Sequence, residues 1–267
     1  MVEKFILFLR GNNLSENTIS SYVKTLSMFN SMYEEISKKN LLGFKGYLLE
    51  NYKPKTVNLR IQGINKYLDF VKKEKLKLTP IKLQQKTFLE NVISDADYRY
   101  FVNQLKKDNN WDWYFVVRYL AATGARISEL IQLKVEHVQV GHYDIYSKGG
   151  KVRRIYIPKK LKEETLRYYD LKNINSGFLF LNKFGNRITT RGISIQLKKL
   201  AIKYGINPNV VYPHSFRHRF AKNFLEKYND IALLADLMGH ESIETTRIYL
   251  RRTSEEQQEI VNKVITW

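Results

Sequence analysis

The sequence contains no cysteine, which excludes disulfide bonds and thiolate metal sites. Chemistry must therefore come from tyrosine, lysine, arginine, histidine and carboxylate side chains, and we expect neither a bound metal nor a cofactor. The absence of cysteine also fits a reducing compartment, so we expect the protein to be cytoplasmic.

Long apolar runs are also missing. No uninterrupted stretch approaches the roughly 20 residues that span a bilayer, and the opening Met1-Val2-Glu3-Lys4 lacks the pattern of a signal peptide. Acidic residues are few, since 26 Asp and Glu stand against 45 Lys and Arg, giving a formal charge of +19 and a pI near 9.8. This excess favours a polyanionic partner, and without apolar runs a nucleic acid is favoured over a membrane.

The 267 residues are 43% hydrophobic, enough for one large domain or two ordinary ones. Near the start, apolar residues recur at helical spacing in two stripes: Ile19, Tyr22, Leu26 and Phe29, then Val57, Ile61, Ile64, Leu68 and Val71. The Lys-rich stretch 72–86 breaks this pattern and is typical of an extended linker. Helical spacing resumes at Ser94. We predict a helical domain over 1–78, a basic linker over 79–88 and a second domain over 89–267.

The second domain is predicted to be mainly α (α+β), with a small antiparallel sheet. Residues typical of strands flank the stretch Ser147-Lys148-Gly149-Gly150-Lys151, and two adjacent glycines there predict a hairpin turn. The run 177–181 (Gly-Phe-Leu-Phe-Leu) is expected to supply a third strand.

Two local motifs bear candidate functional groups early in this domain. In Thr-Gly-Ala-Arg-Ile-Ser-Glu-Leu (123–130), Arg126 and Glu129 are three residues apart and share a helix face. Taken alone, the motif favours an ordinary helix with a surface ion pair. Lys148 at the hairpin turn either presents its ammonium group to a ligand or is a solvated charge.

Two further motifs lie near the end. In Tyr-Pro-His-Ser-Phe-Arg-His (212–218), the proline suits a helix start, which places His214 and Arg217 on one face of the first turn. Farther on, Gly239 is expected to end one helix, His240 to lie in the connection, and Tyr249 to lie two turns into the next helix. The alternatives are a surface turn and a half-buried tyrosine.

In combination, these groups are what cleavage of a phosphodiester by a tyrosine requires. Guanidinium groups match the nonbridging oxygens of the transition state, and nearby cations help a phenol of pKa near 10 to react as phenolate. The order of these motifs along the chain resembles that of the tyrosine recombinase (phage integrase) family: Thr-Gly-x-Arg-x-Ser-Glu-Leu, a hairpin lysine, His-x-x-Arg-His, Gly-His and Tyr. The resemblance covers essentially the whole chain, and the compact layout is most similar to Xer recombinases and small integrases.

The resemblance implies a helical, SAM-like core-binding domain before a catalytic domain. It implies that Tyr249 is the nucleophile and forms a 3′-phosphotyrosyl bond, while Arg126 and Arg217 bind the scissile phosphate. His214 and His240 would bind it and assist proton transfer. Lys148 would be the general acid, with Lys151 as the alternative in the same hairpin.

The family also implies double-stranded DNA as partner, a Holliday junction, and four subunits on two DNA sites. The C-terminal segment fits assembly into such a complex. A predicted capping box at Ser254 and Gln257 precedes a stripe of apolar residues at helical spacing: Ile260, Val261, Val264, Ile265 and Trp267. We expect this helix to dock in a neighbouring subunit, the alternative being its own domain. Two other functions remain open: a type IB topoisomerase, and a non-catalytic DNA-binding accessory protein.

Overall fold

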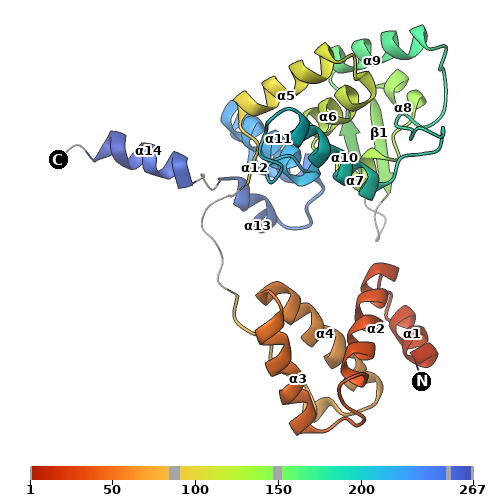
Figure 1. Cartoon of the computed structure of the whole chain (residues 1–267), viewed down its shortest axis with the longest axis vertical. Helices are drawn as coiled ribbons and strands as arrows, with labels where there is room; N and C mark the ends of the chain where they lie inside the picture. The colour runs from red at the N-terminus through yellow and green to blue at the C-terminus, as the bar shows by residue number, and fades with distance from the viewer. Residues whose placement is uncertain (1, 84–90, 147–151, 251–253, 266–267) are drawn as a thin grey trace. The chain divides into compact units, whose positions relative to one another are not determined.

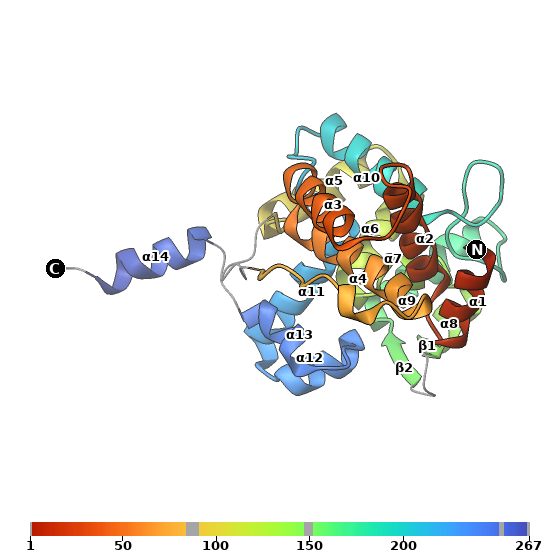
Figure 2. The same cartoon turned by 90° about the horizontal axis from the view of Figure 1, so that it is seen from below.

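The computed structural model describes residues 2–83, 91–146, 152–250 and 254–265. The chain divides into two compact units, Met1–Gln85 and Lys86–Trp267, each with its own apolar core (Figures 1 and 2). Within the described ranges, no helix combines the length and the apolar composition needed to cross a bilayer.

The first unit is a small helical bundle. Its elements are α1 (Val2–Gly11), α2 (Glu16–Asn30), α3 (Lys38–Asn51), α4 (Pro54–Phe70) and the 3₁₀ helix η1 (Glu74–Leu76). The Ser15 side chain caps α2 by accepting a hydrogen bond from the backbone of Thr18. The two predicted stripes are buried except for Val71, which follows α4 and is only partly buried. Leu26 on α2 and Ile61 on α4 are at most 1% exposed.

The stretch after α4 is held to the first unit. Leu78 is buried in its core, and Asn65 on α4 binds both backbone groups of Leu78, donating to the carbonyl and accepting from the amide at 2.8 Å each. Asn58 holds Ile81 in the same way, at 2.9 and 2.8 Å. Two asparagine side chains therefore hold the stretch up to Ile81 to the first unit through contacts that the Lys-rich sequence does not suggest.

The second unit is mainly helical, as predicted. Its elements are α5 (Asp95–Lys107), α6 (Trp111–Thr123), α7 (Ile127–Leu130), α8 (Val135–Val140), β1 (His142–Tyr146), β2 (Val152–Tyr156), α9 (Lys159–Leu171), α10 (Thr190–Lys203), α11 (Pro213–Tyr228), α12 (Ile231–Met238), α13 (Ile243–Thr246), the 3₁₀ helix η2 (Arg247–Leu250) and α14 (Ser254–Val264). The Ser94 hydroxyl caps α5.

Strands β1 and β2 form the predicted antiparallel hairpin, with Tyr143 opposite Ile155. The turn between them, 147–151, lies outside the described residues. Within those residues the sheet has two strands, so the predicted third strand is wrong. In the run 177–181, Phe178 and Leu181 form only isolated bridges, to Lys134 and Arg187, and no ladder extends from them.

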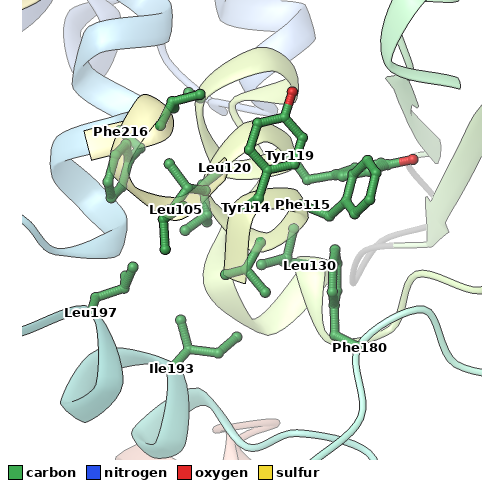
Figure 3. Close-up of a cluster of buried hydrophobic side chains, with 14 of the residues drawn as sticks. Leu105, Tyr114, Phe115, Tyr119, Leu120, Leu130, Phe180, Ile193, Leu197 and Phe216 are labelled. Carbon is green, nitrogen blue, oxygen red and sulfur yellow. The ribbon is translucent and has the colours of Figure 1, made fainter. Parts of the chain in front are cut away.

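The core of the second unit surrounds α6 (Figure 3). Tyr114, Phe115 and Tyr119 are at most 1% exposed although they lie on different faces of α6, as expected for a helix covered on all sides. Phe216 on α11 packs into the same core. The C-terminal end of α6 and the N-terminal half of α11 are thereby fixed side by side.

Candidate active site

Arg126 and Glu129 lie at the turn that follows α6. Gly124 takes the left-handed conformation (φ 60°), which ends α6, and Arg126 becomes the N-cap of α7. The Glu129 carboxylate accepts hydrogen bonds from the Arg126 amide at 2.7 Å and from its Nη1 at 2.9 Å. The predicted pair is therefore present, and the Arg126 side chain remains 40% exposed.

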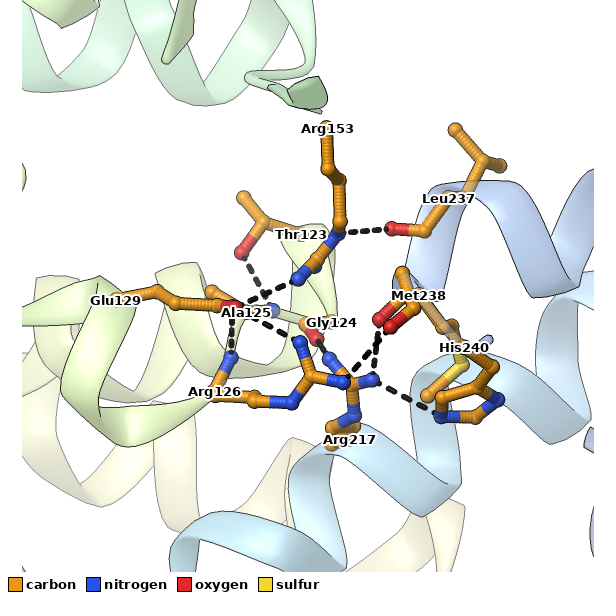
Figure 4. A network of polar contacts seen from close by, with 11 residues as sticks. Thr123, Gly124, Ala125, Arg126, Glu129, Arg153, Arg217, Leu237, Met238 and His240 are labelled. Carbon is orange, nitrogen blue, oxygen red and sulfur yellow. Dashed lines mark hydrogen bonds and ion pairs between the residues drawn. The ribbon is translucent and has the colours of Figure 1, made fainter. Parts of the chain in front are cut away.

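Arg217 on α11 reaches the same turn from below and is only 2% exposed (Figure 4). Its Nη1 donates to the Gly124 carbonyl, and its Nη2 donates to the Met238 carbonyl at 2.6 Å. Burial and the nearby positive charge of Arg126 lower the pKa of Arg217 to about 10, so the group is still a cation at neutral pH.

His240 follows α12 directly. Asp230 caps this helix. Gly239 ends it with φ 61°, as predicted for that glycine. Arg217 Nη2 lies 3.1 Å from His240 Nε2, and because a guanidinium only donates, Nε2 accepts. The hydrogen of the neutral ring is then on Nδ1 and is donated to Thr246 Oγ1 at 2.8 Å. Burial and the adjacent arginines lower the pKa of His240 to about 4, which agrees with a neutral ring.

Tyr249 lies against this histidine. Ser242 caps α13, but α13 ends at residue 246 and Tyr249 lies on the tighter 3₁₀ helix η2. The predicted place of Tyr249 two turns into one continuous helix is therefore wrong. The ring is 6% exposed, stacks on His240 at 6.0 Å and contacts His218 at 5.3 Å between ring centroids. Burial raises the pKa of the Tyr249 phenol, while the charge of Arg217 acts in the opposite direction.

Arg153 completes the group and was missed in the sequence. It lies on β2 with its side chain 8% exposed, donating from Nη1 to Glu129 Oε1 at 2.7 Å and from Nε to the Leu237 carbonyl at 2.9 Å. A signal was present, since Arg153 alternates with Ile155 and Ile157, and therefore shares the inward face of a predicted strand.

The remaining predicted residues are only partly placed. His214 lies in the first turn of α11, which begins at Pro213 as predicted, and its ring is 6.1 Å from that of His218. These two histidines have the i, i+4 spacing of helical metal ligands, yet the described residues hold no group of three or more potential ligands. Lys148 and Lys151 lie outside the described residues.

The structure thus gathers Arg126, Arg217, His240 and Tyr249 from segments far apart in the sequence. We call Arg126, Arg153, Arg217 and Glu129 the arginine cluster; three positive charges and one negative charge leave +2. Such a cluster suits a phosphodiester, because guanidinium groups bind phosphate oxygens with charge-assisted hydrogen bonds. The arrangement suits phosphoryl transfer beside a tyrosine.

Known proteins agree with this class. The model of the phage integrase family matches residues 91–256. The chain is 31% identical to the tyrosine recombinase XerA of Pyrococcus horikoshii, over 98% of this chain and 93% of that protein. It is 28% identical to the tyrosine recombinase XerD of Oceanobacillus iheyensis, over 94% and 93%.

Solved structures show the same fold. The Tn1549 transposon integrase in complex with transposon right end DNA has a TM-score of 0.72 at 16% identity, covering 98% of each chain. A crystal structure of XerA recombinase has a TM-score of 0.55 at 23% identity, covering 100% of this chain and 98% of that one. The chain belongs to the phage integrase family and is a tyrosine recombinase, an enzyme of site-specific DNA recombination.

Proposed function

We propose that this recombinase cleaves and rejoins double-stranded DNA through a covalent bond between Tyr249 and a 3′ phosphate. The observation that carries the proposal is the position of Tyr249 against His240 and beside the +2 arginine cluster. Binding of duplex DNA is supported by the relatives whose structures hold it, the Tn1549 integrase with transposon right end DNA and XerH with its difH substrate.

The proposed step is an in-line displacement. The Tyr249 oxygen attacks phosphorus, the bond from phosphorus to the 5′ oxygen breaks, and the phenolic proton passes to a base. Arg126 and Arg217 stabilise the nonbridging oxygens, His214 and His240 bind the phosphate and assist proton transfer, and Lys148 protonates the departing 5′ oxygen. Since the phosphotyrosine retains the energy of the cleaved bond, attack by a 5′ hydroxyl of a second strand rejoins the DNA and leads through a Holliday junction.

The neutral His240 is suited to a proton-accepting role. Its Nε2 lone pair accepts from Arg217 in the free protein and becomes available once Arg217 turns to the phosphate, while the hydrogen on Nδ1 stays donated to Thr246. A base must lie within hydrogen-bond reach of the proton that it accepts, so the Tyr249 and His240 rings, 6.0 Å apart between centroids, have to rearrange for a direct transfer.

Two of the proposed groups must move before they reach DNA, because Arg217 is 2% and Tyr249 6% exposed. We expect η2, which carries Tyr249, to shift when DNA enters, uncovering both groups. Hydrogen exchange at the amides of residues 247–250 should then become faster in the DNA complex. Unchanged or slower exchange there would contradict the shift.

Assembly into a tetramer on two DNA sites is a further part of the proposal. In α14 and just after it, Val261, Val264 and Ile265 are 50%, 61% and 47% exposed, and apolar residues in such a row favour burial against another surface. Ile260 and Trp267 lie outside the residues whose side chains are described. Replacing Val261 and Val264 together by glutamate should leave binding of one subunit to DNA intact and abolish larger complexes in analytical ultracentrifugation; unchanged complexes would count against docking through α14.

The test of function is covalent capture. The protein is incubated with a random duplex library in buffer with chelator, denatured, and the DNA that stays on the protein is sequenced, with Tyr249→Phe as the matched control. We expect adducts on 3′ ends, clustered at one sequence and absent from the variant, whose DNA affinity stays within a few fold. Adducts without a common sequence would favour a topoisomerase, and salt-sensitive binding without adducts would favour the accessory protein.

A further inference from the structure

The end of α12 is held by three arginines at once. The consecutive carbonyls of Leu237, Met238 and Gly239 accept hydrogen bonds from Arg153 at 2.9 Å, from Arg217 at 2.6 Å and from Arg126 at 2.9 Å. A helix leaves its last carbonyls without partners within the helix, and this end carries partial negative charge, so cations are favoured there. The residue that follows these three carbonyls is His240.

Of the three arginines, Arg153 is placed to act through the others. Its Nη1 binds the same Glu129 oxygen, Oε1, that Arg126 Nη1 binds, at 2.7 and 2.9 Å. Its Nε binds the Leu237 carbonyl. Arg153 therefore joins the turn that carries Arg126 to the helix end that carries His240, while its side chain is only 8% exposed.

The fit around Arg153 is close. A Cβ atom on Gly239 would lie 2.3 Å from Arg153 Cδ, so the helix end packs directly on the aliphatic part of the arginine. Arg153 Nη2 is buried and has no hydrogen-bond partner among the described residues. An arginine with one unpaired nitrogen is costly to bury. An apolar side chain of similar volume would stabilise the fold as well, so stability alone does not account for an arginine at this position.

We propose that Arg153 is a positioning residue for DNA cleavage, which sets the separation of Arg126 and His240 around the scissile phosphate. The inference rests on the proposed function. The planar guanidinium is the side chain for this task, because it holds two acceptors in a fixed geometry, whereas the ammonium of a lysine binds them as a point charge on a flexible chain. A displacement of about 1 Å in a catalytic group costs on the order of a hundredfold in rate.

The neighbouring residue provides a matched control. Arg154 lies on the same strand but on its outer face, with its side chain 45% exposed. It also binds one carboxylate through two nitrogens, at 2.7 and 2.8 Å to Asp144. A change at Arg154 removes the same charge and the same kind of pair without touching the α12 end.

The experiment compares Arg153→Gln, Arg153→Lys and Arg154→Gln on the duplex obtained by covalent capture with the unchanged protein. Three quantities are measured: the single-turnover rate of adduct formation, the dissociation constant for the duplex and the unfolding midpoint. We expect the two Arg153 variants to form adduct at least about tenfold more slowly with affinity within about threefold, and Arg154→Gln to stay within about twofold. Unchanged rates in the Arg153 variants, or loss of folding in both, would overturn the proposal.

A second substrate separates positioning from a merely structural role. A methylphosphonate at the scissile position replaces a charged oxygen by a methyl group, so that the charge of Arg126 matters less to the reaction. If Arg153 acts by placing that charge, its loss should slow cleavage of the methylphosphonate duplex several-fold less than cleavage of the natural one. An equal loss on both duplexes would overturn the proposal.

A readout without DNA keeps the proposal separate from the proposed function, which fails if the unchanged protein forms no adduct that depends on Tyr249. In that case the ring resonances of His240 are followed by NMR in the free protein. Arg153→Gln should shift them and Arg154→Gln should not, because only Arg153 braces the helix end before His240. Equal shifts in both variants, or none in either, would overturn the role of Arg153.

Discussion

Replacing Glu129 by glutamine removes the one negative charge of the arginine cluster, and we expect it to lower the free energy of unfolding by about 3 kcal/mol. The carboxylate accepts three hydrogen bonds of 2.7 to 2.9 Å and is 11% exposed. Burial by itself raises the pKa of Glu129, but Arg153 and Arg126 outweigh it and hold the pKa below its usual value. The carboxylate is therefore charged in the folded protein at neutral pH.

The magnitude follows from which partner is left behind. Removing one member of a buried ion pair costs about 3–5 kcal/mol, because the remaining charge is buried without compensation. Here only Arg153 is stranded, at 8% exposure, whereas Arg126 is 40% exposed and regains water. The glutamine also keeps one carbonyl oxygen as an acceptor. The cost should therefore fall at the lower end of that range.

The matched control is Asp144→Asn, which breaks the exposed pair with Arg154. The two pairs have similar distances, but Asp144 and Arg154 are 27% and 45% exposed, so we expect a loss below about 1 kcal/mol. Both variants are compared with the unchanged protein by urea unfolding at pH 7, followed by circular dichroism. Equal losses would refute the reasoning, since burial of the pair would then have no effect.

Two further predictions concern conformation and protonation. Gly124→Ala should lower the free energy of unfolding by about 1–3 kcal/mol in the same urea assay, because φ is 60° and the new Cβ would lie 2.5 Å from the Phe220 ring. The control is Gly46→Ala, inside a helix and next to open space, which should be neutral or stabilising by up to about 1 kcal/mol. A larger loss for Gly46→Ala than for Gly124→Ala would contradict this. Burial lowers the pKa values of His218 and His240 to about 4, whereas the pKa of a histidine in the unfolded chain is about 6.5. Between these values the unfolded chain binds protons that the folded protein does not, so the free energy of unfolding falls as the pH drops from 6.5 towards 4. We expect urea midpoints to decrease over that window, and a constant midpoint would contradict the prediction.

The sequence predicts well what local chemistry decides. Ser15, Ser94 and Asp230 cap helices, because their side chains satisfy amides only a few residues away. Gly239 ends α12 for a similarly local reason, since glycine enters the left-handed conformation at little cost. The hairpin pairing of β1 and β2 also follows from its own residues.

What the sequence does not predict depends on contacts between distant segments. The order after α4 comes from Asn65 and Asn58, polar side chains whose partners are backbone groups 13 and 23 residues away. The role of Arg153 depends on Glu129 and on the end of α12, 24 and 84 residues away. Tyr249 lies on a 3₁₀ helix, with its ring against His218 of α11 and against His240, and no local periodicity encodes these contacts.

The central claim is that Tyr249, among the 18 tyrosines of the chain, bonds to DNA. The most direct test is mass spectrometry of the trapped adduct after digestion with nuclease and trypsin. We expect the nucleotide mass, attached through phosphate, on the peptide Ile-Tyr-Leu-Arg that spans residues 248–251. The same mass on a peptide that carries another tyrosine, or on a serine, would contradict the account.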